Sequence, residues 1–221
     1  MNNYNKQNEI TLTDFSKESI DSKYSQGFVF TRIGKGIMNQ IRSLRIDLQE
    51  FEFNSENRRI LRKTEWVELE SLNIPLEESK YDYNIHKMGK EFYYKKNNEY
   101  VFSAAKIKEL ILDSDKTNFN NLLKFKDSET GLTLGYAISL ETENIFHYAF
   151  PFYDLSSKRE NLGMGMILKS IEYSIEHQKK YFYLGSVYTT KSRYKLQFNN
   201  IEWWDQREWS KDIEKLKKIL T

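Results

Sequence analysis

Residues 161–186 read NLGMGMILKSIEYSIEHQKKYFYLGS and contain the clearest secondary-structure pattern in the chain. The final six residues, YFYLGS, are rich in the aromatic and aliphatic residues that favour strands, and Gly185 ends the run. The residues before them repeat apolar side chains with the 3.6-residue period of an amphipathic helix. That apolar stripe consists of Met164, Ile167, Leu168, Ile171 and Ile175.

Further elements are expected on both sides of this helix and strand. Toward the C-terminus we expect a last strand in 201–209 and an amphipathic helix in 211–220. Toward the N-terminus, turn residues near 127–131 and 141–144 divide a meander of strands over 122–154. Earlier still we expect helices within 16–28, 54–66, 80–96 and 103–114, and strand-like alternation within 28–32 and 44–48. This order predicts an α+β fold with a mixed, mostly antiparallel sheet flanked by helices.

Composition narrows the classes of function. The 221 residues are ample for a hydrophobic core, and the formal net charge is +2, so any affinity for nucleic acid must come from local clusters. No cysteine is present, which excludes disulfides and thiolate chemistry and suits a reducing cytoplasm. The three histidines lack metal-ligand spacing, and His147, alone on a predicted strand, is expected to be a satisfied core or edge residue. No signal peptide or membrane span is expected.

Two glycines lie where a phosphate could bind. Gly163 and Gly165 open the 161–186 helix after a predicted strand, and free N–H groups at a helix start attract anions. An acetyl-CoA site would require Arg or Gln three residues before Gly163, where the chain has Glu160. Arg159 is one position out of register. Close packing of helix against sheet is the competing explanation for both glycines.

Cations gather in two segments. Residues 32–63 contain many arginines although lysine predominates elsewhere, and arginine suits the recognition of phosphate and carboxylate groups. Lys191, Arg193 and Lys195 follow at alternate positions beyond the 181–186 strand. For the first segment the alternative is a solvated helix face. For the second it is a solvated hairpin edge, where lysines discourage strand-to-strand aggregation.

Three segments, taken in order, resemble the arginyl-tRNA–protein transferase and bacterial aspartate/glutamate leucyltransferase family. They are QIRSLRIDLQEFEFNSENRRILRK (40–63), FYDLSSKRENLGMGMILKSIEYS (152–174) and YFYLGSVYTTKSRYKLQF (181–198). The matching positions are Leu44, Arg45, Phe51, Ser55, Arg58 and Arg59 in the first segment, Tyr153, Asp154, Arg159, Leu162 and Gly163 in the second, and Tyr183, Leu184, Gly185, Lys191, Arg193, Tyr194, Lys195 and Phe198 in the third.

The chain departs from the family pattern in two ways. The cysteine-rich N-terminal segment of the family is replaced by the cysteine-free RIGKGIMNQIRSL, and Ser192 replaces a methionine of the last motif. The resemblance implies a GNAT-type acyltransferase fold. We expect residues 1–70 to form an N-terminal part with the arginine-rich segment and 71–221 to form the GNAT-like core, together as one compact unit.

The resemblance also implies an activity. It implies transfer of Arg or Leu from aminoacyl-tRNA to the N-terminal α-amine of a protein whose first residue is acidic, a tag for degradation. It implies tRNA as co-substrate, no further cofactor and no metal. Tyr194, Lys195 and Asp154 are then the expected catalytic residues, with Asp154 orienting an ammonium group unless it only caps a turn. The expected tRNA-binding residues are Arg45, Arg58, Arg59, Arg159, Gly163, Lys191 and Arg193.

Two other functions stay open at this point. One is an acetyl-CoA-dependent N-acetyltransferase on the same fold, which Glu160 disfavours. The other is a non-catalytic tRNA-binding module, which would bind tRNA in a salt-sensitive way without transferring anything.

Overall fold

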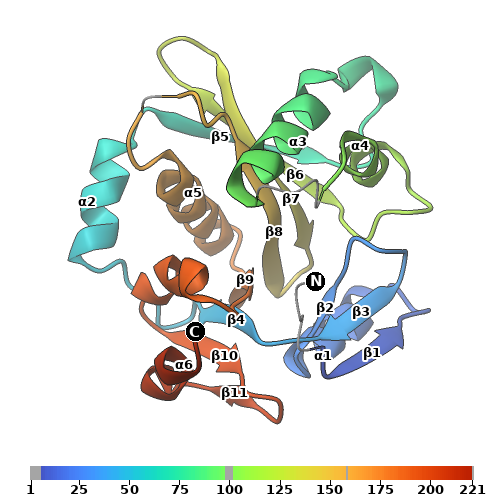
Figure 1. Cartoon of the computed structure of the whole chain (residues 1–221), viewed down its shortest axis with the longest axis vertical. Helices are drawn as coiled ribbons and strands as arrows, with labels where there is room; N and C mark the ends of the chain where they lie inside the picture. The colour runs from blue at the N-terminus through green and yellow to red at the C-terminus, as the bar shows by residue number, and fades with distance from the viewer. Residues whose placement is uncertain (1–5, 98–101, 158, 221) are drawn as a thin grey trace. The chain divides into compact units, whose positions relative to one another are not determined.

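The computed structural model of the chain describes residues 6–97, 102–157 and 159–220 (Figure 1). The chain divides into two compact units, each built from segments that are distant in sequence. The first unit takes residues 1–57, 141–147 and 174–221, and the second takes residues 58–140 and 148–173.

The first unit contains a small antiparallel sheet of order β1-β3-β2. Its strands are β1 (Asn8–Thr11), β2 (Phe28–Phe30) and β3 (Ile37–Gln40). Helix α1 (Lys17–Ser25) lies between β1 and β2 in sequence, and the hydroxyl of Ser16 caps it by accepting a hydrogen bond from the backbone N–H of Ser19.

The first unit also holds strands of the large sheet, in the order β11-β10-β4-β9 followed by the first residues of β8. Strand β9 pairs antiparallel with β4 and parallel with β8. Because β8 and β9 are parallel neighbours, they need a crossover, which helix α5 supplies. The bounds are β4 (Ser43–Asp47), β8 (Ile145–Tyr153), α5 (Leu162–Glu176), β9 (Tyr181–Ser186), β10 (Ile201–Trp204), β11 (Trp209–Ser210) and α6 (Ile213–Ile219).

The second unit holds the rest of β8 and the antiparallel neighbours β7, β6 and β5. Helices α3 and α4 lie side by side in this unit (Figure 1), and Ile107, Leu110 and Ile111 of α4 are fully buried. The bounds are α2 (Ser55–Lys63), β5 (Val67–Asn73), the 3₁₀ turn η1 (Glu78–Lys80), α3 (Asn84–Asn97), α4 (Ala104–Leu112), β6 (Asn121–Asp127) and β7 (Thr133–Glu141).

The predicted α+β class, with a mixed and mostly antiparallel sheet, is confirmed, and every predicted helix is present. The side chain of Asn54 caps α2 by accepting a hydrogen bond from the N–H of Asn57 at 2.9 Å. One detail of the prediction is wrong. The cations beyond β9 lie on a 3₁₀ helix, η2 (Thr190–Gln197), and not on a hairpin edge. In the described ranges no helix has the length and apolar character needed to cross a bilayer.

Candidate active site

Strand β9 ends in a bulge within the first unit. Leu44 of β4 faces Gly185 and Arg45 faces Tyr183, so Leu184 is an extra residue without an opposite partner. Gly185 has a φ of +74°, a left-handed conformation that glycine adopts without the steric cost of a Cβ. Such bulges turn backbone groups and side chains out of the regular ladder. Here the bulge makes two carbonyl groups available at the end of the strand.

The ammonium group of Lys195 occupies the end of this strand. Its Nζ atom donates to the carbonyl oxygens of Leu184 and Ser186, at 2.7 and 2.9 Å. These two residues flank Gly185. A Cβ atom placed on Gly185 would lie 3.9 Å from this Nζ and 3.8 Å from Nε2 of His147. These are ordinary van der Waals distances, so it is the positive φ, and not a lack of space, that favours glycine at the bulge.

Burial changes the acid–base behaviour of Lys195. Removal of its ammonium from water lowers its pKa from 10.5 to about 8, because desolvation disfavours the charged form. A neutral amine still has two N–H bonds for the two carbonyls and then has a free lone pair. Lys195 can thus lose its proton near neutral pH without giving up its hydrogen bonds to Leu184 and Ser186.

His147 and Tyr24 form an uncharged buried pair beside the bulge. Nδ1 of His147 is 2.9 Å from the hydroxyl of Tyr24, which also accepts from the N–H of Phe30 at 3.3 Å. Desolvation first, and then the charge of Lys195, lowers the pKa of His147 to about 3, so the ring is neutral at neutral pH. The prediction that His147 is a satisfied core histidine is confirmed.

Arg45 was predicted to contact tRNA phosphates, and the structure contradicts this. Its guanidinium bonds to Glu202 through Nε and Nη2 at 2.8 and 2.7 Å, and its Nη1 donates to the hydroxyl of Tyr183 at 3.3 Å. The guanidinium carbon lies 3.9 Å from the ring centroid of Tyr181 and 4.1 Å from that of Trp209. The side chain is only 8% exposed, so it stabilises the sheet and does not face a ligand.

The other cations of the last motif point outward. Lys191 and Arg193 are exposed, and Tyr194 is 47% exposed beside them on η2. The ammonium of Lys195 lies 6.0 Å from the centroid of the Tyr194 ring. A phenol and two exposed cations thus lie on the same 3₁₀ helix as Lys195, whose ammonium is turned toward the end of β9.

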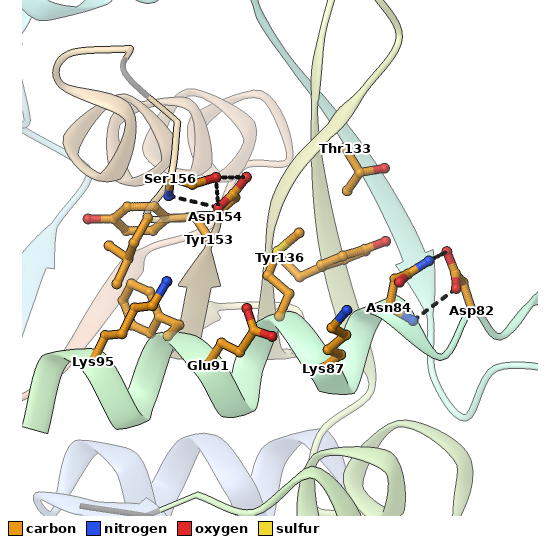
Figure 2. A pocket seen from close by; sticks show the side chains of 13 residues that line it. Asp82, Asn84, Lys87, Glu91, Lys95, Thr133, Tyr136, Tyr153, Asp154 and Ser156 are labelled. Atoms are coloured by element: carbon orange, nitrogen blue, oxygen red, sulfur yellow. Dashed lines mark hydrogen bonds between the residues drawn. The ribbon is translucent and has the colours of Figure 1, made fainter. Parts of the chain in front are cut away.

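Asp154 belongs to the second unit and caps a turn, whereas its predicted role in orienting an ammonium group stays a prediction. Its carboxylate accepts from the N–H of Ser156 at 2.8 Å and from the Ser156 hydroxyl at 2.7 Å, which is a turn cap. The same exposed carboxylate also lines a cavity of about 430 Å³ together with the neighbouring Tyr153 (Figure 2). A capped carboxylate keeps lone pairs for a ligand, so the cap does not remove it from the site.

The glycines at the start of α5 serve packing. A Cβ on Gly163 would come within 2.9–3.1 Å of the phenol of Tyr153, and one on Gly165 would come within 2.8 Å of the side chain of Thr64. Both glycines let a neighbouring side chain approach the helix backbone. The phosphate-loop interpretation of Gly163 is therefore not supported, and the packing explanation accounts for both positions.

Arg159 was also predicted to bind tRNA, but it is engaged within its own unit. Its Nη2 lies 2.8 Å from Asp127 and 3.4 Å from Glu129, in the turn between β6 and β7, and its guanidinium carbon lies 4.4 Å from the Trp66 ring centroid. Arg159 fastens that turn, and we no longer assign it to tRNA. Arg58, exposed, and Arg59, half-buried, lie on α2, and their contact with tRNA stays a prediction.

The predicted site residues thus fall into two groups, one in each unit. Lys195, Tyr194, Lys191 and Arg193 lie at the end of β9, whereas Asp154 lies at the cavity of the second unit. Their convergence on one crevice stays a prediction.

The cavity of the second unit also has a charged wall on α3 that sequence reasoning missed, because charges spaced along a helix are typical of a solvated face. Over the described ranges, no group of three or more histidine, aspartate or glutamate residues could hold a metal ion.

Comparison with known proteins gives distant likenesses to transferases. No protein-family model matches the chain. The chain is 26% identical over 165 residues to an aspartate/glutamate leucyltransferase of Saccharophagus degradans, a match that covers 72% of this chain and 64% of the relative. The chain therefore spans less than two thirds of that relative.

Similar solved structures are more remote in sequence. L-PGS from Bacillus licheniformis has a TM-score of 0.48 at 12% identity, covering 77% of this chain and 52% of that one. FemX has a TM-score of 0.45 at 10% identity, covering 80% and 61%. A GCN5-related glucosamine N-acetyltransferase region of a fungal multi-domain GH3 β-N-acetylglucosaminidase has a TM-score of 0.49 at 10% identity, covering 88% and 23%. The α+β fold with its mixed, mostly antiparallel sheet is assigned from the order and pairing of the strands, and the GNAT-type classification stays a prediction.

Proposed function

We propose that the chain is an aminoacyltransferase that moves Leu or Arg from aminoacyl-tRNA to the α-amine of a protein N-terminus with an acidic first residue. The observation that carries the proposal is the Lys195 ammonium, held by two carbonyls at the end of β9 with its pKa lowered to about 8. This lysine closes the sequence motif shared with the transferase family. The match to a leucyltransferase over 72% of the chain supports the same assignment. Charged tRNA as the donor fits the cytoplasm, where we expect the protein to act.

The reaction needs little covalent help from the protein, because the ester of aminoacyl-tRNA is already activated. The nitrogen of the acceptor attacks the ester carbonyl carbon, a C–N bond forms and an oxyanion develops. The C–O bond to the terminal ribose of tRNA then breaks, and one proton passes overall from the nitrogen to the ribose oxygen. The enzyme must hold the reacting atoms about 3–3.5 Å apart and move that proton.

Lys195 has the properties needed to move the proton. An α-amine has a reference pKa of about 7.7–8.0, close to the value of about 8 for Lys195, so proton transfer between them is nearly balanced. Neutral Lys195 accepts the proton through its lone pair, and its charged form then donates to the departing ribose oxygen. The exposed phenol of Tyr194 is placed to stack on a terminal base or to donate to the oxyanion.

The tRNA would be bound through exposed cations. Lys191 and Arg193 are exposed next to Lys195 and can contact phosphates, which positions a nucleic acid without reading its sequence. Arg58 and Arg59 on α2 are the remaining candidates for such contacts. Arg45 and Arg159 are weaker candidates, because Arg45 is buried against Glu202 and Arg159 is paired with Asp127.

Acetyl-CoA is a poorer donor for this chain. Its pyrophosphate would need open backbone N–H groups at the start of α5, and there the phenol of Tyr153 packs against Gly163. Glu160, exposed just before the helix, would repel the pyrophosphate. The packing and the charge at this helix start both favour tRNA as the donor.

A transfer assay tests the proposal. Labelled Leu-tRNA and Arg-tRNA are each incubated with the full chain and with peptides that differ only in the first residue, namely Asp, Glu, Asn and N-acetyl-Asp. We expect label on the Asp and Glu peptides from one of the two tRNAs, and none on the acetylated peptide. Label from acetyl-CoA alone, or salt-sensitive tRNA binding without transfer to any peptide, would overturn the proposal.

A further inference from the structure

The cavity of the second unit lies between helix α3 and the sheet ends formed by β7 and β8 (Figure 2). Its volume of about 430 Å³ is within the range of small-ligand sites. One wall is a single face of α3, and the other consists of residues from β7, β8 and the turn after β8. Its residues were not singled out by the family motifs, apart from Tyr153 and Asp154.

The α3 wall carries three charges in alternating sign. Lys87, Glu91 and Lys95 are spaced four residues apart, so they lie on one helix face, and Figure 2 shows Glu91 between the two lysines. The helical rise of 1.5 Å per residue puts successive members about 6 Å apart along the axis. Although this spacing permits ion pairs, no hydrogen bond or ion pair joins these three side chains to any described residue. Three charges are left available to a ligand.

The opposite wall adds the carboxylate of Asp154 and two aromatic rings. Asp154 and Glu91 lie on opposite sides of the cavity in Figure 2, and the rings of Tyr136 and Tyr153 lie on the side of Asp154. The carboxylate of Asp154 is kept in place by the N–H and hydroxyl of Ser156. A third carboxylate, that of Asp82, also lines the cavity and accepts from the N–H and the side-chain amide of Asn84. Carboxylates next to the ammonium groups of Lys87 and Lys95 make a site for a positive group that carries a negative group beside it.

From this arrangement we infer that the cavity binds an α-ammonium group flanked by a carboxylate, as in the N-terminal residue of an acidic peptide or in a free dicarboxylic amino acid. The ammonium lies between Glu91 and Asp154, and the carboxylate of the ligand meets Lys87 or Lys95 one helical turn away. Tyr136 and Tyr153 cover the aliphatic part of the ligand. The role as an acceptor site rests on the function proposed above, whereas the binding itself does not.

The charges argue against two other ligand classes. A nucleotide phosphate would meet Glu91 and Asp154, and like charges at close range disfavour binding. A metal ion prefers carboxylates without nearby ammonium groups, and Lys87 and Lys95 lie on both sides of Glu91. A zwitterion satisfies both signs of charge at once.

Binding without tRNA tests this inference. Isothermal titration of the full chain would use a peptide that starts with Asp, its Asn counterpart, its N-acetylated form, and free aspartate. We expect the Asp peptide to bind at least tenfold more tightly than the Asn and acetylated peptides. Equal or tighter binding of free aspartate would identify the amino acid as the ligand, and weaker binding would identify the peptide. Equal affinity for the Asp, Asn and acetylated peptides would overturn the inference.

Variants locate the binding at the cavity. Glu91→Gln should weaken binding of the Asp peptide at least tenfold, and Lys87→Gln with Lys95→Gln should abolish the preference for Asp over Asn. Lys90→Gln, an exposed lysine on the same helix outside the cavity lining, is the matched control and should change nothing. Unchanged affinity in both cavity variants would place the ligand elsewhere.

The same variants separate this inference from the proposed function. Peptide binding that depends on Glu91, together with no transfer from any aminoacyl-tRNA, would keep the cavity and remove the transferase. Transfer whose peptide KM is unaffected by Glu91→Gln would keep the transferase and remove the cavity as its acceptor site.

Discussion

The guanidinium of Arg45 and the carboxylate of Glu202 meet inside the first unit at 2.7 and 2.8 Å, with side chains only 8% and 10% exposed. The two residues lie on the paired strands β4 and β10 and face each other directly in the ladder. Arg45 and Glu202 are separated by 157 positions in sequence. The arginine of the family-like Leu-Arg segment is therefore a structural residue here.

Neutralising Glu202 should be costly. Glu202→Gln leaves the charge of Arg45 buried without its counter-ion, and we expect the free energy of unfolding to fall by about 3–5 kcal/mol. Urea denaturation measures this. The exposed pair of Lys217 and Glu214 is the control, since Glu214→Gln should cost less than about 1 kcal/mol. Equal losses of unfolding free energy in the two variants would show that the buried pair stabilises the fold no more than the exposed pair.

The buried His147 should make the fold acid-sensitive. Unfolded histidine titrates near 6.5, whereas folded His147 stays neutral down to about pH 3, so between these values the unfolded state binds one more proton. The free energy of unfolding should therefore fall as the pH decreases below 6.5. His147 should contribute about 1.4 kcal/mol of this fall per pH unit. Comparing wild type with His147→Asn between pH 6 and 4 isolates this slope. Equal slopes in the two proteins would contradict this account of His147.

Gly163→Ala tests the packing role of the glycine. Alanine is the better helix former by about 1 kcal/mol, yet its Cβ would lie 2.9 Å from the Tyr153 hydroxyl, so we expect a net loss of stability. In a Tyr153→Leu background the same change should become neutral or stabilising. The melting temperatures of wild type, the two single variants and the double variant measure this effect. A loss that does not depend on Tyr153 would contradict the packing explanation.

The exposed cations of η2 should contribute to tRNA binding. Lys191→Ala with Arg193→Ala removes up to two phosphate contacts, so the dependence of log K on log salt should become shallower by about 1–2. Lys217→Ala with Lys218→Ala, on the exposed face of α6, is the matched control and should leave the slope unaltered. Identical slopes in both double variants would mean that η2 does not touch tRNA.

Sequence patterns predicted the elements well where one face of an element is apolar. The 3.6-residue stripe of α5 and the strand YFYLGS after it are both present. The cations beyond β9 were misplaced because alternate charges resemble an exposed strand. Only the backbone shows that Lys195 turns back to the carbonyls around Gly185.

Long-range partners set the limits of sequence reasoning. Arg45 lies between two inward residues of β4, so alternation predicts an exposed side chain, but Trp209 and Tyr181 cover it. The charged side chains on α3 could not be assigned to a cavity from the sequence, because only the structure shows that Asp154 lines the same cavity. The predicted division of the chain into an arginine-rich part, 1–70, and a transferase core, 71–221, stays a prediction.

Single-turnover transfer by wild type, Lys195→Met and Lys195→Arg, followed from pH 6 to 9, tests the central claim most directly. With labelled aminoacyl-tRNA and a peptide that starts with Asp, the wild-type rate should rise with a midpoint near pH 8, as Lys195 and the acceptor α-amine lose their protons. Both variants should be slower by about 10²-fold or more, with Lys195→Arg keeping the wild-type melting temperature. Transfer by Lys195→Arg at the wild-type rate and with the wild-type pH profile, or no transfer by the wild type from either Leu-tRNA or Arg-tRNA, would contradict the account.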